Sequence, residues 1–224
     1  EKELNALGGL LNNPQRPFTA VVGGAKISSK IGVLENLLDK VDNLIVGGGM
    51  AYTFVKANGG KIGNSIHEDD QMEVAKAIEK KAKDKGVNLI MATDVLVTDD
   101  FSGNGTNKVV PVNEIPDGFE GVDAGPNTQK AFEEVIKKSK TILMNGPVGA
   151  FENPKFAQGT KAVLNAIVEA TKAGAVSVVG GGDSVSAAKK FCNGDDFTHI
   201  STGGGASLEF IEGKVLPGVD ALDD

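Results

Sequence analysis

The sequence predicts an α/β fold in which a doubly wound, mainly parallel sheet lies between two layers of helices. Three observations carry this prediction. Short runs rich in β-branched residues alternate with longer segments of helical spacing, as in a chain of β-α units. Most of the short runs are apolar at consecutive positions, which is typical of strands buried on both faces. Three of them are followed directly by glycines, and a fourth is followed by glycines after one residue.

The predicted elements follow one another along the chain in this alternating order. Strands are expected at 18–22, 44–46, 87–91, 108–112, 141–144, 176–179 and 198–201. Helices are expected at 27–38, 70–85, 127–138, 156–173 and 184–191. The stretch 94–123 departs from the pattern because it is rich in Asp, Asn, Gly and Pro. Its alternating part predicts a small antiparallel excursion at a sheet edge, where we expect no chemistry.

Length and composition exclude several classes of protein. The 224 residues fit a single domain, 1–224, with enough chain for a buried core. The formal charge of −7 argues against nucleic acid as a partner, and the apolar stretches are too short for a membrane span. A lone cysteine, Cys192, and the lack of a secretory leader pattern lead us to expect a cytoplasmic protein.

Glycine accounts for 30 of the 224 residues, and its clusters mark the ends of predicted strands. The clusters lie at 23–24, 47–49, 180–182 and 203–205. Ligands of an open parallel sheet bind beyond the carboxyl ends of its strands, where glycine lets backbone N–H groups approach a phosphate. One such pair is explained by a tight turn. Four at equivalent positions predict a nucleotide site.

Two common phosphate-binding motifs are missing. Both Gly-Lys pairs, at 60–61 and 213–214, are followed by an apolar residue, so the chain has no P-loop. No G-x-G is completed by a third glycine three residues later, which disfavours an NAD-dependent oxidoreductase.

Charged and polar residues beside the glycines are candidates for phosphate and metal chemistry. Asp183 and Ser184 lie where a glycine loop meets a helix, so the carboxylate could hold Mg²⁺ or could only cap the helix. Lys26 and Lys30 share a helix face behind a glycine turn and could neutralise phosphate or form a solvated face. Asn145 and Glu152 could hydrogen-bond a ribose or a metal ligand, although a plain turn explains the Gly-Pro pair between them equally well.

Five segments together resemble one known family. They are GGAKISSK at 23–30, GGGMAYTF at 47–54, NGPVGAFE at 145–152, GGGDS at 180–184 and STGGGASLE at 201–209. Their order and spacing resemble the C-terminal, nucleotide-binding half of phosphoglycerate kinases, over essentially the whole of 1–224. The resemblance implies a Rossmann-like domain that binds Mg-ADP or Mg-ATP, in an enzyme that moves a phosphoryl group between 1,3-bisphosphoglycerate and ADP.

The resemblance also implies a role for individual residues. Lys26 would stabilise the transferring phosphoryl group, and Lys30 would contact the nucleotide's phosphates. The metal ligand for Mg²⁺ would be Asp183, beside Ser184. Backbone N–H groups for the phosphoryl group would come from Gly181, Gly182, Gly204 and Gly205. Asn145 would lie near the phosphates and Glu152 would bind the ribose. Adenine would lie against Gly23, Ala25, Gly47, Gly48, Val122 and Pro147.

Two positions depart from the family's pattern, and the chain covers only half of the family's fold. Ser184 stands where Thr is usual, and Val122 stands where a larger aliphatic residue is common. Residues 1–11 resemble the end of the interdomain helix, and 212–224 resemble a tail that packs on the missing N-terminal, phosphoglycerate-binding domain. We therefore expect a monomer that binds nucleotide but does not turn over. The alternative is a stand-alone nucleotide-binding regulatory module.

Overall fold

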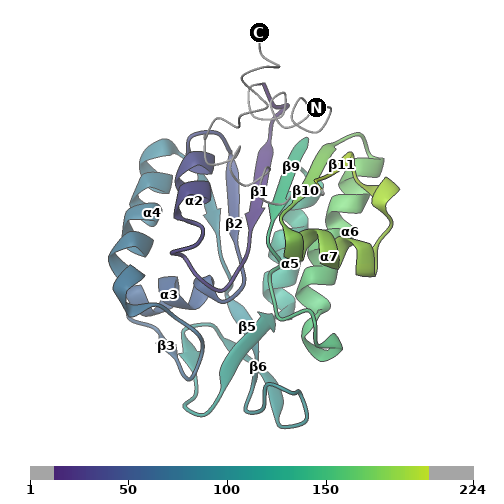
Figure 1. Ribbon diagram of the computed structural model, residues 1–224. Coiled ribbons are helices and arrows are strands. Elements are labelled where there is room, and N and C mark those ends of the chain that lie inside the picture. The colour runs from purple at the N-terminus through teal and green to yellow at the C-terminus, as the bar shows by residue number, and fades with distance from the viewer. Residues whose placement is uncertain (1–12, 202–224) are drawn as a thin grey trace.

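A six-stranded parallel sheet forms the centre of the computed structural model, which describes residues 13–201 (Figure 1). The strand order is β11-β10-β9-β1-β2-β4, and every neighbouring pair is parallel. The strands are β1 (Phe18–Val22), β2 (Asn43–Val46), β4 (Asn88–Ile90), β9 (Thr141–Asn145), β10 (Val176–Gly180) and β11 (His199–Ile200). The predicted fold class is confirmed.

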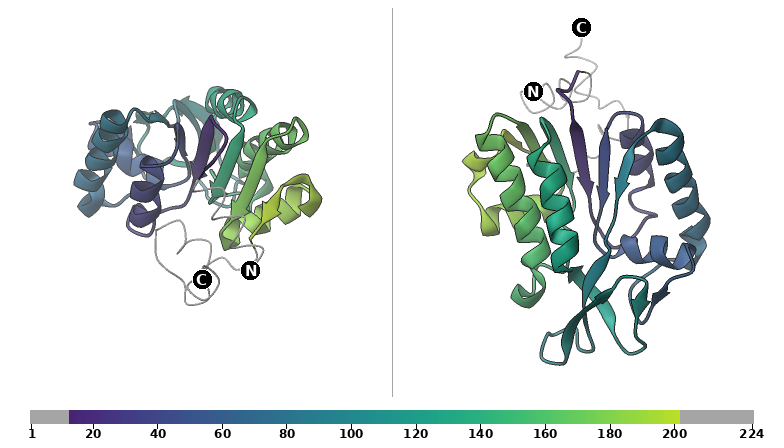
Figure 2. Two further views of the ribbon diagram at one scale, coloured as in Figure 1. Left: turned by 90° about the horizontal axis from the view of Figure 1, so that it is seen from above. Right: turned by 180° about the vertical axis from the view of Figure 1, so that it is seen from behind.

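Helices cover both faces of this sheet (Figure 2). They are α2 (Ile31–Leu38), α3 (Met50–Ala57), α4 (Met72–Lys85), α5 (Pro126–Lys137), α6 (Gln158–Lys172) and α7 (Gly182–Phe191). In β1, Phe18, Ala20 and Val22 pack into the core cluster that α2, α3 and α4 complete. Val21 packs into a second cluster with α5, α6 and α7. The period of two along a strand thus separates two cores, and β1 and β9 are buried along their whole lengths.

Local sequence signals account for several helix ends. Pro126 occupies the first turn of α5, where its missing N–H costs nothing. Gly86 ends α4 with a left-handed conformation at φ 72°. None of the helices between residues 13 and 201 is both long and apolar enough to cross a membrane.

The chain winds outward in two directions from the centre of the sheet. From β1 it passes to β2 and β4 on one side, and from β9 it passes to β10 and β11 on the other. The neighbours β1 and β9 are therefore the point at which the winding direction reverses. In sheets of this kind, the connections leaving such a pair diverge to opposite faces and open a crevice at the carboxyl ends.

The region 94–124 differs from our expectation. It forms a separate three-stranded antiparallel sheet of β6 (Asn107–Pro111), β5 (Asp94–Thr98) and β8 (Glu120–Ala124), not an excursion at the edge of the main sheet. A further short pair joins β3 (Lys61–Ile62) to β7 (Glu114–Ile115). Figure 1 shows β5 and β6 beyond the carboxyl ends of the main strands. This second sheet has its own small core, which includes Tyr52 and Val97.

Two helices also differ from the prediction. The helix expected from residue 27 begins only at Ile31, because residues 27–30 form a turn that buries Ile27. The helix α3, directly after Gly47–Gly49, was not among the predicted elements. Both differences lie beside the carboxyl ends of β1 and β2, where loops from distant parts of the chain meet.

Candidate nucleotide site

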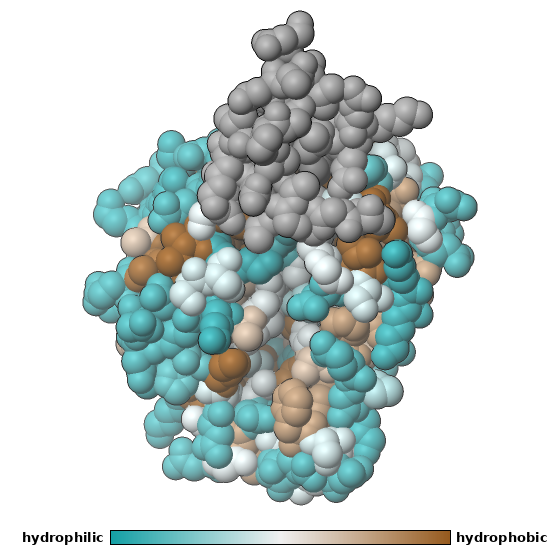
Figure 3. All heavy atoms as spheres, in the orientation of Figure 1, coloured by the Kyte–Doolittle hydropathy of each residue, from teal (hydrophilic) through white to brown (hydrophobic). Residues whose placement is uncertain are grey.

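A cavity of about 480 Å³ opens at the carboxyl ends of β1, β2 and β9. Gly24, Gly48 and Pro147 line it from the loops that follow those strands, and Val122 lines it from β8. Figure 3 shows this face of the molecule hollowed between its two halves. The cavity therefore lies where the reversed winding of the sheet predicts a ligand crevice.

The loops around the cavity pack backbone against backbone. A Cβ atom on Gly23 would lie 1.9 Å from the carbonyl oxygen of Pro147, and one on Gly48 would lie 2.7 Å from the backbone of Gly24. Gly48 also has φ +77°, which L side chains rarely adopt. Glycine at these two positions is needed for the loops to approach each other.

The residues that the resemblance assigns to adenine are not all on the cavity wall. Ala25, Gly48, Val122 and Pro147 line it. Gly23 packs against Pro147, and a side chain on Gly47 would collide with Val148 at 2.5 Å. Gly23 and Gly47 therefore shape the loops from behind, and Gly47 lines a smaller void next to the cavity.

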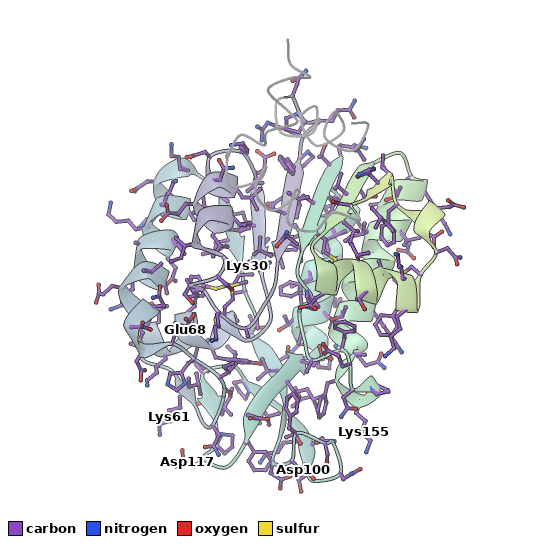
Figure 4. The ribbon with its side chains drawn as sticks, in the orientation of Figure 1. Lys30, Lys61, Glu68, Asp100, Asp117 and Lys155 are labelled. Carbon is purple, nitrogen blue, oxygen red and sulfur yellow. The ribbon has the colours of Figure 1, made fainter. Side chains whose placement is uncertain are left out.

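Lys30 and Asn145 meet across the two central strands. The amine of Lys30, at the start of α2, donates a hydrogen bond to Oδ1 of Asn145 at the end of β9. Figure 4 shows Lys30 directed toward the middle of the molecule. Asn145 is 1% exposed, and its Nδ2 donor has no hydrogen-bond partner among residues 13–201. A buried donor without a partner is costly, so this amide is ready to bind an acceptor such as a phosphate oxygen.

The N-terminus of α7 forms the neighbouring wall. Gly181 caps this helix with φ +91°, and a Cβ placed there would lie 3.5 Å from Nδ2 of Asn145. A Cβ on Gly182 would meet no atom of the described residues within 4 Å, which leaves room for a ligand at the first turn. Ser184 is buried and accepts a hydrogen bond from the backbone N–H of Gly146. Free N–H groups at this helix start favour an anion.

The donors present fit a Mg²⁺ ion that a nucleotide holds jointly with the protein. Asp183, in the first turn of α7, and Glu152 both line the cavity. Among residues 13–201 no group of three acidic, His or Cys side chains converges on one point. Mg²⁺ commonly takes one or two carboxylates and completes its shell with phosphate oxygens and water. Asp183 suits that arrangement, beside the helix terminus where a phosphate would lie.

Lys26 does not lie with the predicted site residues that line the cavity. This lysine directly precedes the turn 27–30. It is exposed and does not line the cavity. Gly24 and Ala25, directly before it, do. Gly204 and Gly205 lie outside the described residues, as do the segments 1–11 and 212–224.

The far end of the cavity is built by residues that the sequence did not single out. Ile66 and Phe101 line it while remaining 47% and 60% exposed. Phe101 leans on Phe156, with 6.1 Å between the ring centroids. Its loop is also tied down by Lys155, whose amine donates to the carbonyl of Gly103 at 2.9 Å. Two exposed apolar side chains facing one cavity are suited to cover a flat base.

Polar groups stand next to these apolar ones. Tyr52 and Glu120 both line the cavity. Burial, together with the negative charges of Asp123 and Glu120, raises the pKa of the Tyr52 hydroxyl. Partial burial also raises the pKa of Glu120. The region where we expected no chemistry therefore supplies Phe101, Glu120 and Val122 to the site. An exposed Phe within an Asp- and Gly-rich stretch is the signal that could have revealed it.

A larger cavity, of about 740 Å³, lies on the other side of α3. Lys61, Asn113 and Asp117 are among its lining residues, and none of the predicted site residues that the structure describes is. It lacks the helix terminus and the loops from β1 and β9. We therefore assign the ligand site to the smaller cavity.

Comparison with known proteins gives consistent results. The family model described as phosphoglycerate kinase matches residues 1–214. The solved structure of phosphoglycerate kinase from Coxiella burnetii is 45% identical, with a TM-score of 0.94, and the match covers 99% of this chain and 56% of that one. The structure of phosphoglycerate kinase from Pyrococcus horikoshii OT3 is 30% identical, with a TM-score of 0.77, covering 99% and 55%. The chain spans little more than half the length of these two proteins.

Proposed function

The chain belongs to the phosphoglycerate kinase family, and on that premise we propose that it is the nucleotide-binding part of such a kinase. The cavity between the β1 and β9 loops binds Mg-ADP or Mg-ATP. The observation that carries this proposal is the buried Asn145, whose Oδ1 accepts a hydrogen bond from Lys30 while its Nδ2, next to the start of α7, has no partner in the described part of the chain. An amine, an amide donor and a helix N-terminus at one place are suited to a polyphosphate.

The proposed orientation follows from the two ends of the cavity. The base lies between Ile66 and Phe101, against Ala25, Gly48, Val122 and Pro147. The ribose lies near Glu152. The phosphates reach Lys30, Asn145 and the first turn of α7. The bound Mg²⁺, held by Asp183, supplies charge neutralisation for the phosphate oxygens.

In the whole enzyme, the terminal oxygen of ADP attacks the phosphorus of the acyl phosphate of 1,3-bisphosphoglycerate. The bond to the carboxyl oxygen breaks, and ATP and 3-phosphoglycerate form, which is a step of glycolysis. Such a transfer depends on positioning and on stabilising the charge of the phosphoryl oxygens. Lys26 and the N–H groups of Gly181 and Gly182 provide that stabilisation, together with those of Gly204 and Gly205.

The phosphoglycerate-binding half lies outside this chain, so the isolated chain binds nucleotide without turning over. Catalysis of this type needs both substrates held together and shielded from water. The single arginine, Arg16, is paired with Asp42 at 2.9 Å, at the opposite end of β1 from the cavity. The described residues thus offer no guanidinium clamp for a second anionic substrate.

Calorimetric titration of the chain with ADP, with and without Mg²⁺, tests the proposal. We expect saturable one-to-one binding that Mg²⁺ strengthens. A chain that is folded by circular dichroism yet binds neither ADP nor ATP would contradict it. Formation of ATP from 1,3-bisphosphoglycerate by the chain alone would contradict the expected inactivity.

A further inference from the structure

Residues 65–69 run as a strap across the site, between β3 and the short helix Asp69–Gln71. Three contacts fix the strap to its surroundings. Oγ of Ser65 accepts a hydrogen bond from the backbone N–H of Gly121 at 2.9 Å, on the base side of the cavity. The N–H of Glu68 donates to Oγ1 of Thr53 at 3.1 Å, and Asp69 pairs with Lys56 at 2.6 Å, both on α3. The strap is thus attached both to β8 and to α3.

Two side chains of the strap extend toward different parts of the site. Ile66 lines the base end of the cavity, and its Cγ2 lies so close to Gly49 that a Cβ there would be 2.5 Å away. The carboxylate of Glu68 reaches the turn that follows Lys26. It accepts hydrogen bonds from the backbone N–H of Ser28 at 3.2 Å and from its hydroxyl at 2.5 Å. Figure 4 shows Glu68 on the same side of the molecule as Lys30.

The charge of Glu68 suits this contact. Partial burial by itself would raise the pKa of Glu68, but hydrogen bonds from Ser28 and Ile27 and the charge of Lys26 outweigh it, and the pKa is lowered. The carboxylate is therefore ionised at neutral pH while it holds the turn. Within this segment, Oγ of Ser29 donates a hydrogen bond to the carbonyl of Lys26 at 3.0 Å.

The turn is anchored at Ile27, which lies in the core, and at Lys30, which donates to Asn145, while Glu68 holds Ser28 between them. Lys26, Ser28 and Ser29 are exposed, and only Ile27 is buried in the core. The turn precedes α2 and replaces the helical conformation that its sequence favours. The carboxylate of Glu68, 40 residues further along the chain, holds the turn by accepting hydrogen bonds from Ser28. This contact is made two residues after Lys26.

We propose that Glu68 is a positioning residue, which holds the turn after Lys26 so that this lysine is directed at the phosphoryl group in transit. The proposal rests on the nucleotide-binding function proposed above. It makes the strap a physical link between the base end of the cavity, through Ile66, and the phosphoryl end, through Lys26. Preorganised charge is the larger part of what a protein contributes to phosphoryl transfer, so a mobile Lys26 is a poorer catalyst.

The test compares the variants Glu68→Ala and Glu68→Gln in the whole 224-residue chain. Gln keeps an oxygen that can accept from Ser28, whereas Ala keeps none. A matched control is Glu79→Ala, which removes another partly buried glutamate that accepts a hydrogen bond, from Asn58 at 2.9 Å. Urea unfolding establishes that each variant is folded.

The first readout needs no ligand. The ¹⁵N heteronuclear NOE of the Lys26 amide reports motion of its backbone on the ps–ns timescale. We expect this NOE to fall in Glu68→Ala and to stay near the original value in Glu68→Gln and Glu79→Ala. An unchanged NOE in Glu68→Ala would overturn the proposal, whether or not the chain binds nucleotide.

The second readout is the ratio of the dissociation constants for Mg-ATP and Mg-ADP. Lys26 acts on the phosphoryl group that ATP carries and ADP lacks, so Lys26→Ala raises this ratio. Glu68→Ala should raise it about threefold by misplacing the lysine, and should add nothing in the Lys26→Ala background. Equal weakening of both nucleotides would indicate a merely structural role and would overturn the proposal. Failure of the original chain to bind either nucleotide would contradict the proposed function, and the NOE then decides the role of Glu68 alone.

Discussion

The amine of Lys30 donates a hydrogen bond to Oδ1 of Asn145, so the residue that precedes α2 is joined to the last residue of β9. This contact spans the two central strands at the point where the winding direction reverses. It also orients the amide, because an Asn whose oxygen is occupied presents its Nδ2 donor elsewhere. That donor is directed toward Gly181, where we propose that phosphate binds.

The first prediction follows from this pair. Replacing Lys30 by Ala removes a positive charge from the phosphate end, and we expect the dissociation constant for Mg-ADP to rise about tenfold or more, as for a lost charged hydrogen bond. Titration calorimetry measures this. Lys40→Ala is the matched control, because the Lys40 amine also donates to an amide oxygen, that of Asn36 at 2.7 Å, but does not line the cavity. Equal affinities in the two variants would exclude Lys30 from the site.

The second prediction concerns the metal. In Asp183→Ala, the difference in ADP affinity with and without Mg²⁺ should largely disappear, because the ion loses its protein ligand. ADP without Mg²⁺ should bind at least as well as before, since a negative charge near the phosphates has been removed. Asp195→Ala, which removes another exposed aspartate close in sequence, is the control. Unchanged dependence on Mg²⁺ in Asp183→Ala would remove this residue from the metal site.

The third prediction separates the base end from the phosphate end. Phe101→Ala should weaken ADP about five- to tenfold, through the loss of stacking, and should leave the binding of inorganic pyrophosphate unchanged. Val109→Ala is a suitable control, because Val109 is 49% exposed on β6 and does not line the cavity. A parallel loss of pyrophosphate binding in Phe101→Ala would mean that Phe101 acts on the fold of the site and does not contact the base.

The fourth prediction is a pH dependence caused by Asp123. This buried carboxyl accepts hydrogen bonds from the N–H groups of Ala124 and Gly159, both at 2.9 Å, but burial still raises its pKa to about 7. The unfolded chain releases this proton near the ordinary value of 3.8. Between these two values the folded state binds more protons, so the contribution of Asp123 to stability falls as the pH rises and levels off above about 7.

Urea unfolding at pH 5 and pH 8 measures this contribution when the original chain is compared with Asp123→Asn. We expect the original chain to lose more stability than the variant between the two values, by about 1 kcal/mol or more. Other carboxyls, such as Asp39 and Asp100, have lowered pKa values. They change the stability of both proteins with pH in the same way. Equal changes in the two proteins would show that Asp123 is ionised in the folded state at pH 5.

The sequence predicted the parts of this fold that local patterns determine. The central strands, the glycines at their ends and most helices follow from short-range periodicity, and parallel pairing then brings the glycine loops to one edge. The turn at residues 27–30 could not be predicted in this way. Its sequence suits a helix, and the contact from Glu68 that holds it comes from 40 residues away.

The base end of the site was hidden for a similar reason. Phe101, Ile66 and Glu120 lie in stretches whose composition is typical of loops, and the one signal of a ligand there is an aromatic residue, Phe101, among Asp and Gly. Phe101 lies in the loop after β5 and Glu120 lies on β8, so the pairing of these two strands brings both to the cavity, whereas Ile66 reaches it from the segment after β3. Helix α3 was missed because it is only eight residues long and directly follows three glycines.

The pairing of β1 with β9 also affects the order in which the sheet folds. Phe18 pairs with Thr141, so this register joins segments from opposite parts of the chain, and closing so long a loop is among the slower events of folding. In a partly folded molecule in which only β1, β2 and β4 have assembled, half of the crevice has not formed and Asn145, on β9, is not in place. A nucleotide would thus bind only to molecules whose sheet is complete. By mass action it would stabilise these molecules against unfolding.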